Sequence, residues 1–292
     1  MKILVFGAGG QLGKALLGSA GKAGHLAMGL SRANVDITDA DAVSHVICSD
    51  VPEAVINAAA YNAVDAAEDN RGLAFRINSE GAGNIAHACN MVGVPICHLS
   101  SDYVFDGSSR TPYREDSPVS PLSVYGASKA RGEDIVRNIA NRHLIIRTSW
   151  VFGRFGNNFV KSILGRLGKA DCLSVIDDQI GCPTSAEDLA TALFKILTTA
   201  HKTEAWGTYH FCGLKAVTWF QFANAIAMAK RLHIPDMTEI VPTTTADYHQ
   251  RAVRPTYSVL DCQSVIANFG INVPEWPTAL ANVVDYLVAG NR

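Results

Sequence analysis

The chain has 292 residues, a formal net charge of −2, and 48% hydrophobic against 18% charged residues. A core large enough for one α/β domain, or for a domain with a smaller lobe, is therefore easy to build, which excludes a disordered chain. The charges are mixed along the chain without a basic stripe, and no apolar run could span a bilayer, so we expect a protein that binds neither nucleic acid nor membrane. The seven cysteines include no C-x-x-C pair, so we expect a cytoplasmic protein whose thiols are reduced and buried.

The first half of the chain alternates strand and helix patterns. Continuous apolar runs predict strands buried on both faces, and helical spacing predicts helices between them. In chain order we expect a strand at 2–6, a helix at 11–22, a strand at 25–30, a helix at 39–48, a strand at 55–60, a helix at 72–91, a strand at 94–100, a helix from 125 and a strand at 144–148. Repeated strand–helix–strand units predict an α/β fold with a doubly wound parallel sheet, like a Rossmann fold.

The pattern loosens after residue 151. We expect a strand at 173–176, a turn at 181–183, a helix from Ser185, whose side chain fits a capping pattern with Asp188, a helix at 218–231 and a loop rich in Pro and Thr at 241–257. Residues 1–152, with a returning helix near 185–200, should therefore form the sheet domain. Residues 153–292 should form mainly a smaller lobe that closes over a ligand.

The turn after the first strand is rich in glycine and reads Gly7-Ala8-Gly9-Gly10-Gln11-Leu12-Gly13. A residue without Cβ suits a tight turn and lets a pyrophosphate approach the backbone, and the N-terminus of the following helix offers N–H groups and partial positive charge. The spacing is G-x-x-G-x-x-G rather than the usual G-x-G-x-x-G. Because a strand precedes the turn and a helix follows it, we expect a dinucleotide site in residues 1–152; a merely structural turn is the alternative.

The tip of the second strand should meet the adenosine ribose of that dinucleotide. An acid there would bind the 2′-hydroxyl of NAD, whereas an arginine would accommodate the 2′-phosphate of NADP. The tip carries Arg32 and no acid before Asp36. We therefore expect NADPH as the cofactor, with NADH as the alternative if Arg32 is only a solvated surface charge.

Tyr125 and Lys129 are four residues apart and would share one face of a helix. An adjacent ammonium stabilises a phenolate and lowers the pKa of the phenol, which could then protonate a ketone oxygen as hydride arrives at the carbon. Ser101 follows the fourth strand, at the edge of the sheet where ligands bind, and its hydroxyl could reach both the ketone and the tyrosine. The three residues together predict a reductase site; a half-buried helix tyrosine and a serine turn cap are the alternatives.

Because of these motifs, the sequence resembles the extended short-chain dehydrogenase/reductase superfamily and, within it, the dTDP-4-dehydrorhamnose reductase family. The resemblance covers nearly the whole chain. The matching stretches are 7–13, 55–61, 64–68, 101–107, 125–129, 147–153, 177–179, 183–184 and 254–255. It implies reduction of the C4 ketone of dTDP-4-dehydro-L-rhamnose to dTDP-L-rhamnose by NADPH, with Ser101, Tyr125 and Lys129 doing the chemistry.

The resemblance also implies contacts with both ligands. Gly10, Gln11 and Leu12 would hold the pyrophosphate, and Lys129 the nicotinamide ribose. The remaining cofactor contacts would be Asp36 and Ile37 beside the adenine, and Ala59, Ala60 and Tyr61 along the third strand's end. The sugar nucleotide would meet Ser101, Asp102, Tyr125 and Trp150, with Asn158 and Arg254 on its diphosphate. Trp150 in a core and Asp102 as a turn cap are the structural alternatives, and Asp65 is assigned no chemistry.

Three departures from the family pattern matter. Position 101 is Ser where Thr is common, which keeps the hydroxyl, and position 62 is Asn where Thr is usual, which puts that cofactor contact in doubt. Some members dimerise through magnesium bound by an acid in the first helix. The matching positions here read Lys14-Ala15-Leu16, so we expect no metal. The oligomeric state is open, with a homodimer as one option.

Two other functions compete with this interpretation. Sugar-nucleotide dehydratases and epimerases share the scaffold, but dehydratases carry an acidic pair after the hydroxyl residue, whereas this chain reads Ser101-Asp102-Tyr103. The regulatory subunit of methionine adenosyltransferase resembles these reductases and can retain the Tyr-x-x-x-Lys pattern without catalysis. The Arg147-Thr148-Ser149-Trp150 stretch is similar to the reductase version and favours an enzyme.

Overall fold

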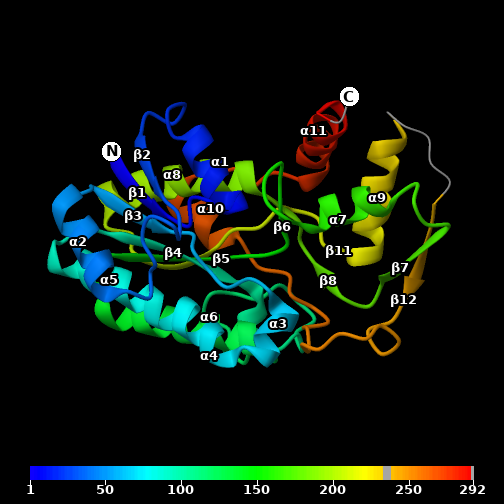
Figure 1. Cartoon of the computed structure of the whole chain (residues 1–292), viewed down its shortest axis with the longest axis horizontal. Coiled ribbons are helices and arrows are strands. Elements are labelled where there is room, and N and C mark those ends of the chain that lie inside the picture. Colours follow the sequence, from blue (N-terminus) through cyan, green and yellow to red (C-terminus); the bar gives the residue numbers. More distant parts are fainter. Residues whose placement is uncertain (233–237, 291–292) are drawn as a thin grey trace.

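A six-stranded parallel sheet lies at the centre of the computed structural model, which describes residues 1–232 and 238–290 (Figure 1). In spatial order its strands are β10 (Gly207–His210), β5 (His143–Thr148), β4 (Ile96–Ser101), β3 (Ala54–Asn57), β1 (Lys2–Phe6) and β2 (Leu26–Leu30). The predicted doubly wound parallel sheet is confirmed. The order reverses at β1, because β2 lies on one side of it and β3 on the other, and ligands bind at such switch points.

Helices cover both faces of the sheet, and alternate residues of β1 enter two separate cores. Ile3 and Val5 face one core, and Leu4 and Phe6 face the other, as the two-residue period of a strand requires. The first core is covered by α1 (Gln11–Ser19), α8 (Ala186–Thr203) and α10 (Gln263–Phe269). The second face carries α2 (Ala40–Asp50), α3 (Val64–Asp69), α4 (Arg71–Phe75), the π-helical segment η1 (Arg76–Gly81), α5 (Ala82–Met91) and α6 (Val124–Ile139).

The remaining elements pack around a third core beside the sheet layer, at the right of Figure 1. They are β6 (Val151–Phe152), α7 (Phe159–Arg166), β7 (Cys172–Ile176), β8 (Ile180–Gly181), β9 (Thr184–Ser185), β11 (Val217–Thr218), α9 (Trp219–Arg231), β12 (Glu239–Thr243) and α11 (Trp276–Ala289). We call these elements the small lobe. Three elements that follow residue 152 in the chain lie on the sheet layer, namely α8, β10 and α10. The division into two domains at residue 152 stays a prediction.

Several expected elements differ in detail. The strand expected at 55–60 ends at Asn57, whose Oδ1 accepts the N–H of Ala59 and so turns the chain out of the sheet. The helix expected at 72–91 is observed as the succession α4, η1 and α5. The loop expected at 241–257 is wrong at its start, because β12 pairs there with β7 in spite of Pro242. The short 3-10 turn η2 (Asp102–Val104), α3, β10, α10 and α11 have no counterpart in the prediction.

The seven cysteines are all free. Five are buried, whereas Cys48 and Cys172 are exposed, which corrects the expectation that all the thiols are buried. Within residues 1–232 and 238–290, no helix combines the length and the apolar character needed to cross a membrane.

Candidate active site

The glycine turn between β1 and α1 packs against the end of β3 more closely than any side chain would allow. Gly7 has φ of +82°, and a Cβ there would lie 2.5 Å from the backbone nitrogen of Ala59. A Cβ on Gly13 would lie 2.3 Å from the carbonyl oxygen of Gly7. Gly10 is the N-cap of α1 and supplies no side chain to cap it. The backbone of the turn is therefore open to an anionic ligand at the helix N-terminus.

Gly13→Ala should destabilise the protein by about 1–3 kcal/mol, because the new methyl group has to displace backbone. It should also weaken NADPH binding, since the turn cannot keep its shape. Gly18→Ala in the same helix is the matched control, because a Cβ there meets nothing within 4 Å and a helical glycine is about 1 kcal/mol less favourable than alanine. Urea unfolding and NADPH titration of both variants measure the effects. Equal stability of the two variants would contradict the packing argument.

A cavity of about 360 Å³ opens beside the glycine turn, at the tips of β1, β2 and β3. All the residues that are expected to hold the adenosine half of the cofactor line this cavity: Gly7, Gly10, Arg32, Asp36, Ile37, Ala59, Ala60 and Tyr61. Arg32 pairs with Asp36 at 3.4 Å, with both side chains largely exposed. The sequence prediction missed Val35, Ala58 and Ile77, which also line the cavity. Asn62 replaces a usual threonine of the family pattern and still faces the cavity.

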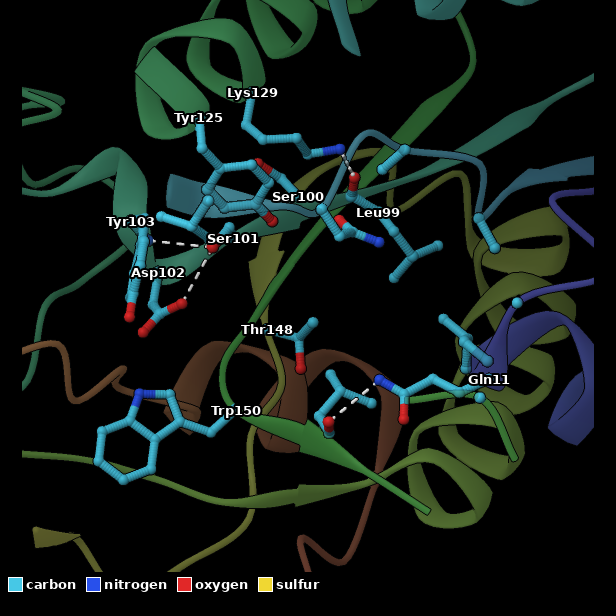
Figure 2. A pocket seen from close by; sticks show the side chains of 18 of the residues that line it. Gln11, Leu99, Ser100, Ser101, Asp102, Tyr103, Tyr125, Lys129, Thr148 and Trp150 are labelled. Carbon is cyan, nitrogen blue, oxygen red and sulfur yellow. Dashed lines mark hydrogen bonds between the residues drawn. The ribbon is translucent and has the colours of Figure 1, made fainter. Parts of the chain in front are cut away.

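A second cavity, of about 480 Å³, continues from the first and shares Gly10, Asn62 and residues 58–60 with it (Figure 2). It is lined by most residues expected to do chemistry or hold substrate, namely Gln11, Leu12, Ser101, Asp102, Tyr125, Lys129 and Trp150. The prediction missed Thr148 and Trp219 on its wall. Thr148 ends β5, so the rule that drew attention to Ser101 at the end of β4 could have found it.

Tyr125 lies in the first turn of α6, where the Ser123 hydroxyl caps the helix by accepting the N–H of Gly126 at 3.1 Å. Burial raises the pKa of Tyr125 to about 12, the Ser101 hydroxyl lowers this pKa by less, and the charge of Asp102 adds to the rise. The phenol is therefore protonated at neutral pH. This suits a group that has to donate a proton.

Lys129 lies one turn further along α6, and its Nζ donates to the carbonyl oxygen of Leu99 at 2.5 Å. Burial lowers the pKa of Lys129 to about 8, although the charge of Glu133 opposes the change. Burial thus raises the pKa of the Tyr125 phenol, and the acidification of Tyr125 by Lys129 stays a prediction. Lys129 lines the 480 Å³ cavity, where its amine can act as a cation or a hydrogen-bond donor.

Ser101 and Asp102 line the same cavity, with Ser101 beside the Tyr125 ring (Figure 2). Ser101 Oγ donates to Asp102 Oδ1 at 3.0 Å and accepts the N–H of Tyr103 at 3.1 Å. Asp102 is 2% exposed, and burial raises its pKa to about 7, against the neighbouring hydroxyls of Ser258 and Ser101. Asp102 Oδ2 has no hydrogen-bond partner among the described residues. The hydroxyl and the carboxyl are thus bonded to each other, and both residues line the cavity.

An aromatic wall closes the cavity on the side of the small lobe. Trp150 has φ of 46°, in the left-handed region, and its indole stacks on Trp219 with centroids 3.4 Å and planes 8° apart. A Cβ on Gly181 would lie 2.5 Å from the Trp150 ring, so glycine is needed there. Because Trp219 occupies one face of Trp150, a substrate meets the pair rather than one free indole.

Two residues expected on the diphosphate are engaged elsewhere. Asn158 caps α7, since its Oδ1 accepts the N–H of Lys161 at 3.1 Å, and its Nδ2 donates to Gln11 Oε1 at 3.3 Å. Arg254 forms a two-point ion pair with Asp65, at 2.7 Å and 3.0 Å. Neither Asn158 nor Arg254 is among the residues that line the two cavities. Asp65, which was assigned no chemistry, is thus the partner that orients Arg254.

Comparison with known proteins supports one family throughout. The family model described as RmlD substrate binding domain matches residues 1–289. A dTDP-4-dehydrorhamnose reductase from Aggregatibacter actinomycetemcomitans is 40% identical over 293 residues, covering 98% of this chain and 99% of that protein. The crystal structure of a dTDP-4-dehydrorhamnose reductase from Clostridium acetobutylicum is 35% identical, with a TM-score of 0.91 over 99% of this chain and 100% of that one.

A further solved relative carries a cofactor. The dTDP-4-dehydrorhamnose reductase from Bacillus anthracis, solved in complex with NADP, is 33% identical, with a TM-score of 0.91 over 98% of this chain and 99% of that one. Sequence identity above one third over the full length, together with the same fold, identifies the family and not the fold alone. The chain belongs to the dTDP-4-dehydrorhamnose reductase family.

Proposed function

We propose that the protein reduces the C4 ketone of dTDP-4-dehydro-L-rhamnose to dTDP-L-rhamnose with NADPH, and that Tyr125 donates the proton. One observation carries the proposal: Ser101, Tyr125 and Lys129 meet in a cavity that continues into the glycine turn. The likeness to NADP-bound and dTDP-sugar-reducing relatives over the whole chain supports both the substrate and the cofactor.

The residues fit a bound dinucleotide. Gly7, Gly10 and Gly13 keep the turn free of side chains, so that a pyrophosphate can approach the backbone at the start of α1. Arg32 provides a guanidinium at the tip of β2, where a 2′-phosphate would lie. When bound, NADPH supplies the hydride for the sugar ketone.

The protein's part in the reaction is to place the ketone and to supply its proton. Ser101 Oγ and the Tyr125 hydroxyl would hold the ketone oxygen, and Tyr125 would protonate it as charge develops there. Lys129 would hold the nicotinamide ribose and balance the charge that remains on the phenolate. The Trp150–Trp219 wall excludes water from the sugar's side of the cavity.

The direct test is loss of NADPH absorbance when dTDP-4-dehydro-L-rhamnose is offered to the purified protein. Net consumption of NADPH with formation of dTDP-L-rhamnose supports the reductase. Unchanged NADPH with a tightly bound, recycled NAD would support an epimerase or dehydratase instead. Stable binding to a partner enzyme without turnover on any ketosugar nucleotide would support a regulatory subunit.

Arg32→Ala should raise the Kd for NADPH about tenfold or more and leave that for NADH nearly unchanged, since an ion pair with a phosphate is worth about 1.5–3 kcal/mol. The side chain stands at the rim of the 360 Å³ cavity, where a 2′-phosphate would compete with Asp36 for it. Arg114→Ala is the control, because Arg114 is equally exposed and pairs with Asp116 away from the cavities. Parallel loss of both affinities would remove Arg32 from cofactor selection.

We also propose where the enzyme works and which oligomeric state it forms. We place it in the cytoplasm, where a reducing environment suits seven free cysteines. A homodimer is the oligomeric state to test first, by light scattering on the purified protein. The described residues include no cluster of three or more His, Cys, Asp or Glu side chains that could hold a metal ion.

A further inference from the structure

A buried acid is connected to Tyr125 through a single hydroxyl group. Asp102 Oδ1 and Ser101 Oγ are hydrogen-bonded at 3.0 Å, and the Ser101 hydroxyl lies beside the Tyr125 phenol (Figure 2). Figure 2 shows the three groups on one side of the cavity, with the Lys129 ammonium directed away from them toward the carbonyl of Leu99. The short path from the phenol to a titratable group therefore runs through Ser101.

The Asp102 carboxyl group is the other end of the path that begins at the Tyr125 phenol. Asp102 lines the 480 Å³ cavity, and its Oδ2 is buried without a hydrogen-bond partner among the described residues. A buried carboxylate oxygen without a partner costs free energy, whereas a protonated carboxyl loses much less. Burial therefore favours the acid form of Asp102.

We propose that Asp102 is the proton reservoir of the reaction and that it restores the proton of Tyr125 through the Ser101 hydroxyl. This inference rests on the proposed reductase function. After the phenol has protonated the ketone oxygen, Ser101 gives its hydroxyl proton to the phenolate and takes the proton of Asp102. The products are the neutral phenol, the unchanged serine and the Asp102 carboxylate, which regains a proton from water through the cavity.

The direction of transfer follows from the acidities of the two ends. Burial raises the pKa of Tyr125 to about 12 but the pKa of Asp102 only to about 7, so a phenolate in this site takes the proton of the carboxyl readily. Ser101 Oγ needs no change of position, because it lies 3.0 Å from Asp102 Oδ1 and beside the phenol; only its hydroxyl hydrogen turns from the carboxyl to the phenolate, while a proton on Oδ1 of the acid form bonds Oγ in its place. Each of the three groups is in place before substrate binds.

The other charged or titratable groups around Asp102 do not change this order. Burial raises the pKa of Tyr103, so this phenol stays neutral in the working range, and Arg254, which is bonded to Asp65 behind it, stays charged. On α6, Tyr125 stays protonated, and Lys129, with a pKa lowered by burial to about 8, titrates later than Asp102. The acid form of Asp102 is therefore lost as the pH rises through about 7.

Asp102→Asn keeps the shape of the side chain and removes its proton. We expect kcat to fall about 10²-fold or more, with little change in NADPH affinity. The wild-type kcat should decline as the pH rises through about 7, and the variant should lack that decline and keep only the change near pH 8. Asp102→Glu should restore the decline and part of the rate. Asp116→Asn, an exposed carboxylate outside the cavities, is the control.

The outcomes separate this proposal from the proposed function. If Asp102→Asn raises KM but leaves kcat and its pH profile unchanged, Asp102 only binds a sugar hydroxyl and the relay is overturned. If the wild type oxidises no NADPH on this substrate, the reductase function fails first. Infrared titration of the protein without substrate then still tests Asp102: a carboxylic acid band lost near pH 7 and missing from Asp102→Asn supports the reservoir, and its absence from the wild type contradicts it.

Discussion

Tyr125→Phe should lose about 10²–10⁴-fold in kcat and bind NADPH as tightly as the wild type. The phenylalanine ring keeps the volume that α6 places in the cavity, so the fold and the cofactor site remain. What disappears is the hydroxyl beside Ser101. The ketone oxygen would then take its proton from Ser101 or water, both of which are poorer donors in a site closed by the Trp150–Trp219 wall.

Two measurements decide the Tyr125 prediction. Single-turnover oxidation of NADPH gives the rate of the chemical step, and fluorescence titration gives the cofactor Kd. Tyr286→Phe on α11 is the control, because that side chain is half exposed and remote from both cavities. Near-normal turnover of Tyr125→Phe would remove the tyrosine from its role. A loss of NADPH affinity equal to the loss of rate would make it a binding residue.

The sheet was predictable because strands buried on both faces leave a simple mark in the sequence. The residues of β1, β4 and β5 are almost wholly buried, and the apolar runs at 3–6 in β1 and 144–146 in β5 are typical of core strands of a parallel sheet. The glycine turn was predictable for a similar reason. Gly7 and Gly13 leave no room for a Cβ, and the spacing of the glycines records that constraint directly.

The missed elements owe their structure to partners far away in the sequence. The strand β10 is four residues long and contains Thr208 and His210, so it shows neither a long apolar run nor alternation. It forms because β5 offers an edge and because His210 is held by the carbonyl oxygen of Tyr113 and by Arg147. No local pattern contains that information.

The site residues also divide into those that a local sequence pattern can place and those whose position depends on partners far away in the sequence. Ser101, Tyr125 and Lys129 belong to one strand end and one helix face, which a sequence pattern can place. Trp219 lies at the cavity because α9 of the small lobe stacks this ring on Trp150, and Arg254 is bonded to Asp65 from a loop at the far end of the chain. The pKa of Tyr125 also depends on this packing, because burial decides it.

Arg147→Met should destabilise the protein by about 3–5 kcal/mol, because it removes the buried counter-ion of Glu133 and leaves this buried carboxylate only the more distant and more exposed Arg137, at 3.5 Å. The Arg147 and Glu133 side chains are 2% and 1% exposed, and two hydrogen bonds of 2.9 Å and 2.7 Å join them. Ser100 Oγ donates to the same carboxylate at 2.5 Å, and Phe105 lies 5.1 Å from the guanidinium. From the sequence alone, both charges would pass for surface residues.

A double variant separates the cost of the unpaired charge from the value of the pair. Arg147→Met with Glu133→Gln removes both charges, keeps the volume of each side chain and leaves an amide that Ser100 can still bond. Because a buried ion pair contributes little beyond its own desolvation, the double variant should recover most of the stability that Arg147→Met loses. Guanidinium unfolding of the wild type, of Arg147→Met, of Glu133→Gln alone and of the double variant measures this. A loss below about 1 kcal/mol in Arg147→Met would mean that Glu133 takes up a proton instead, with its charge no longer part of the core.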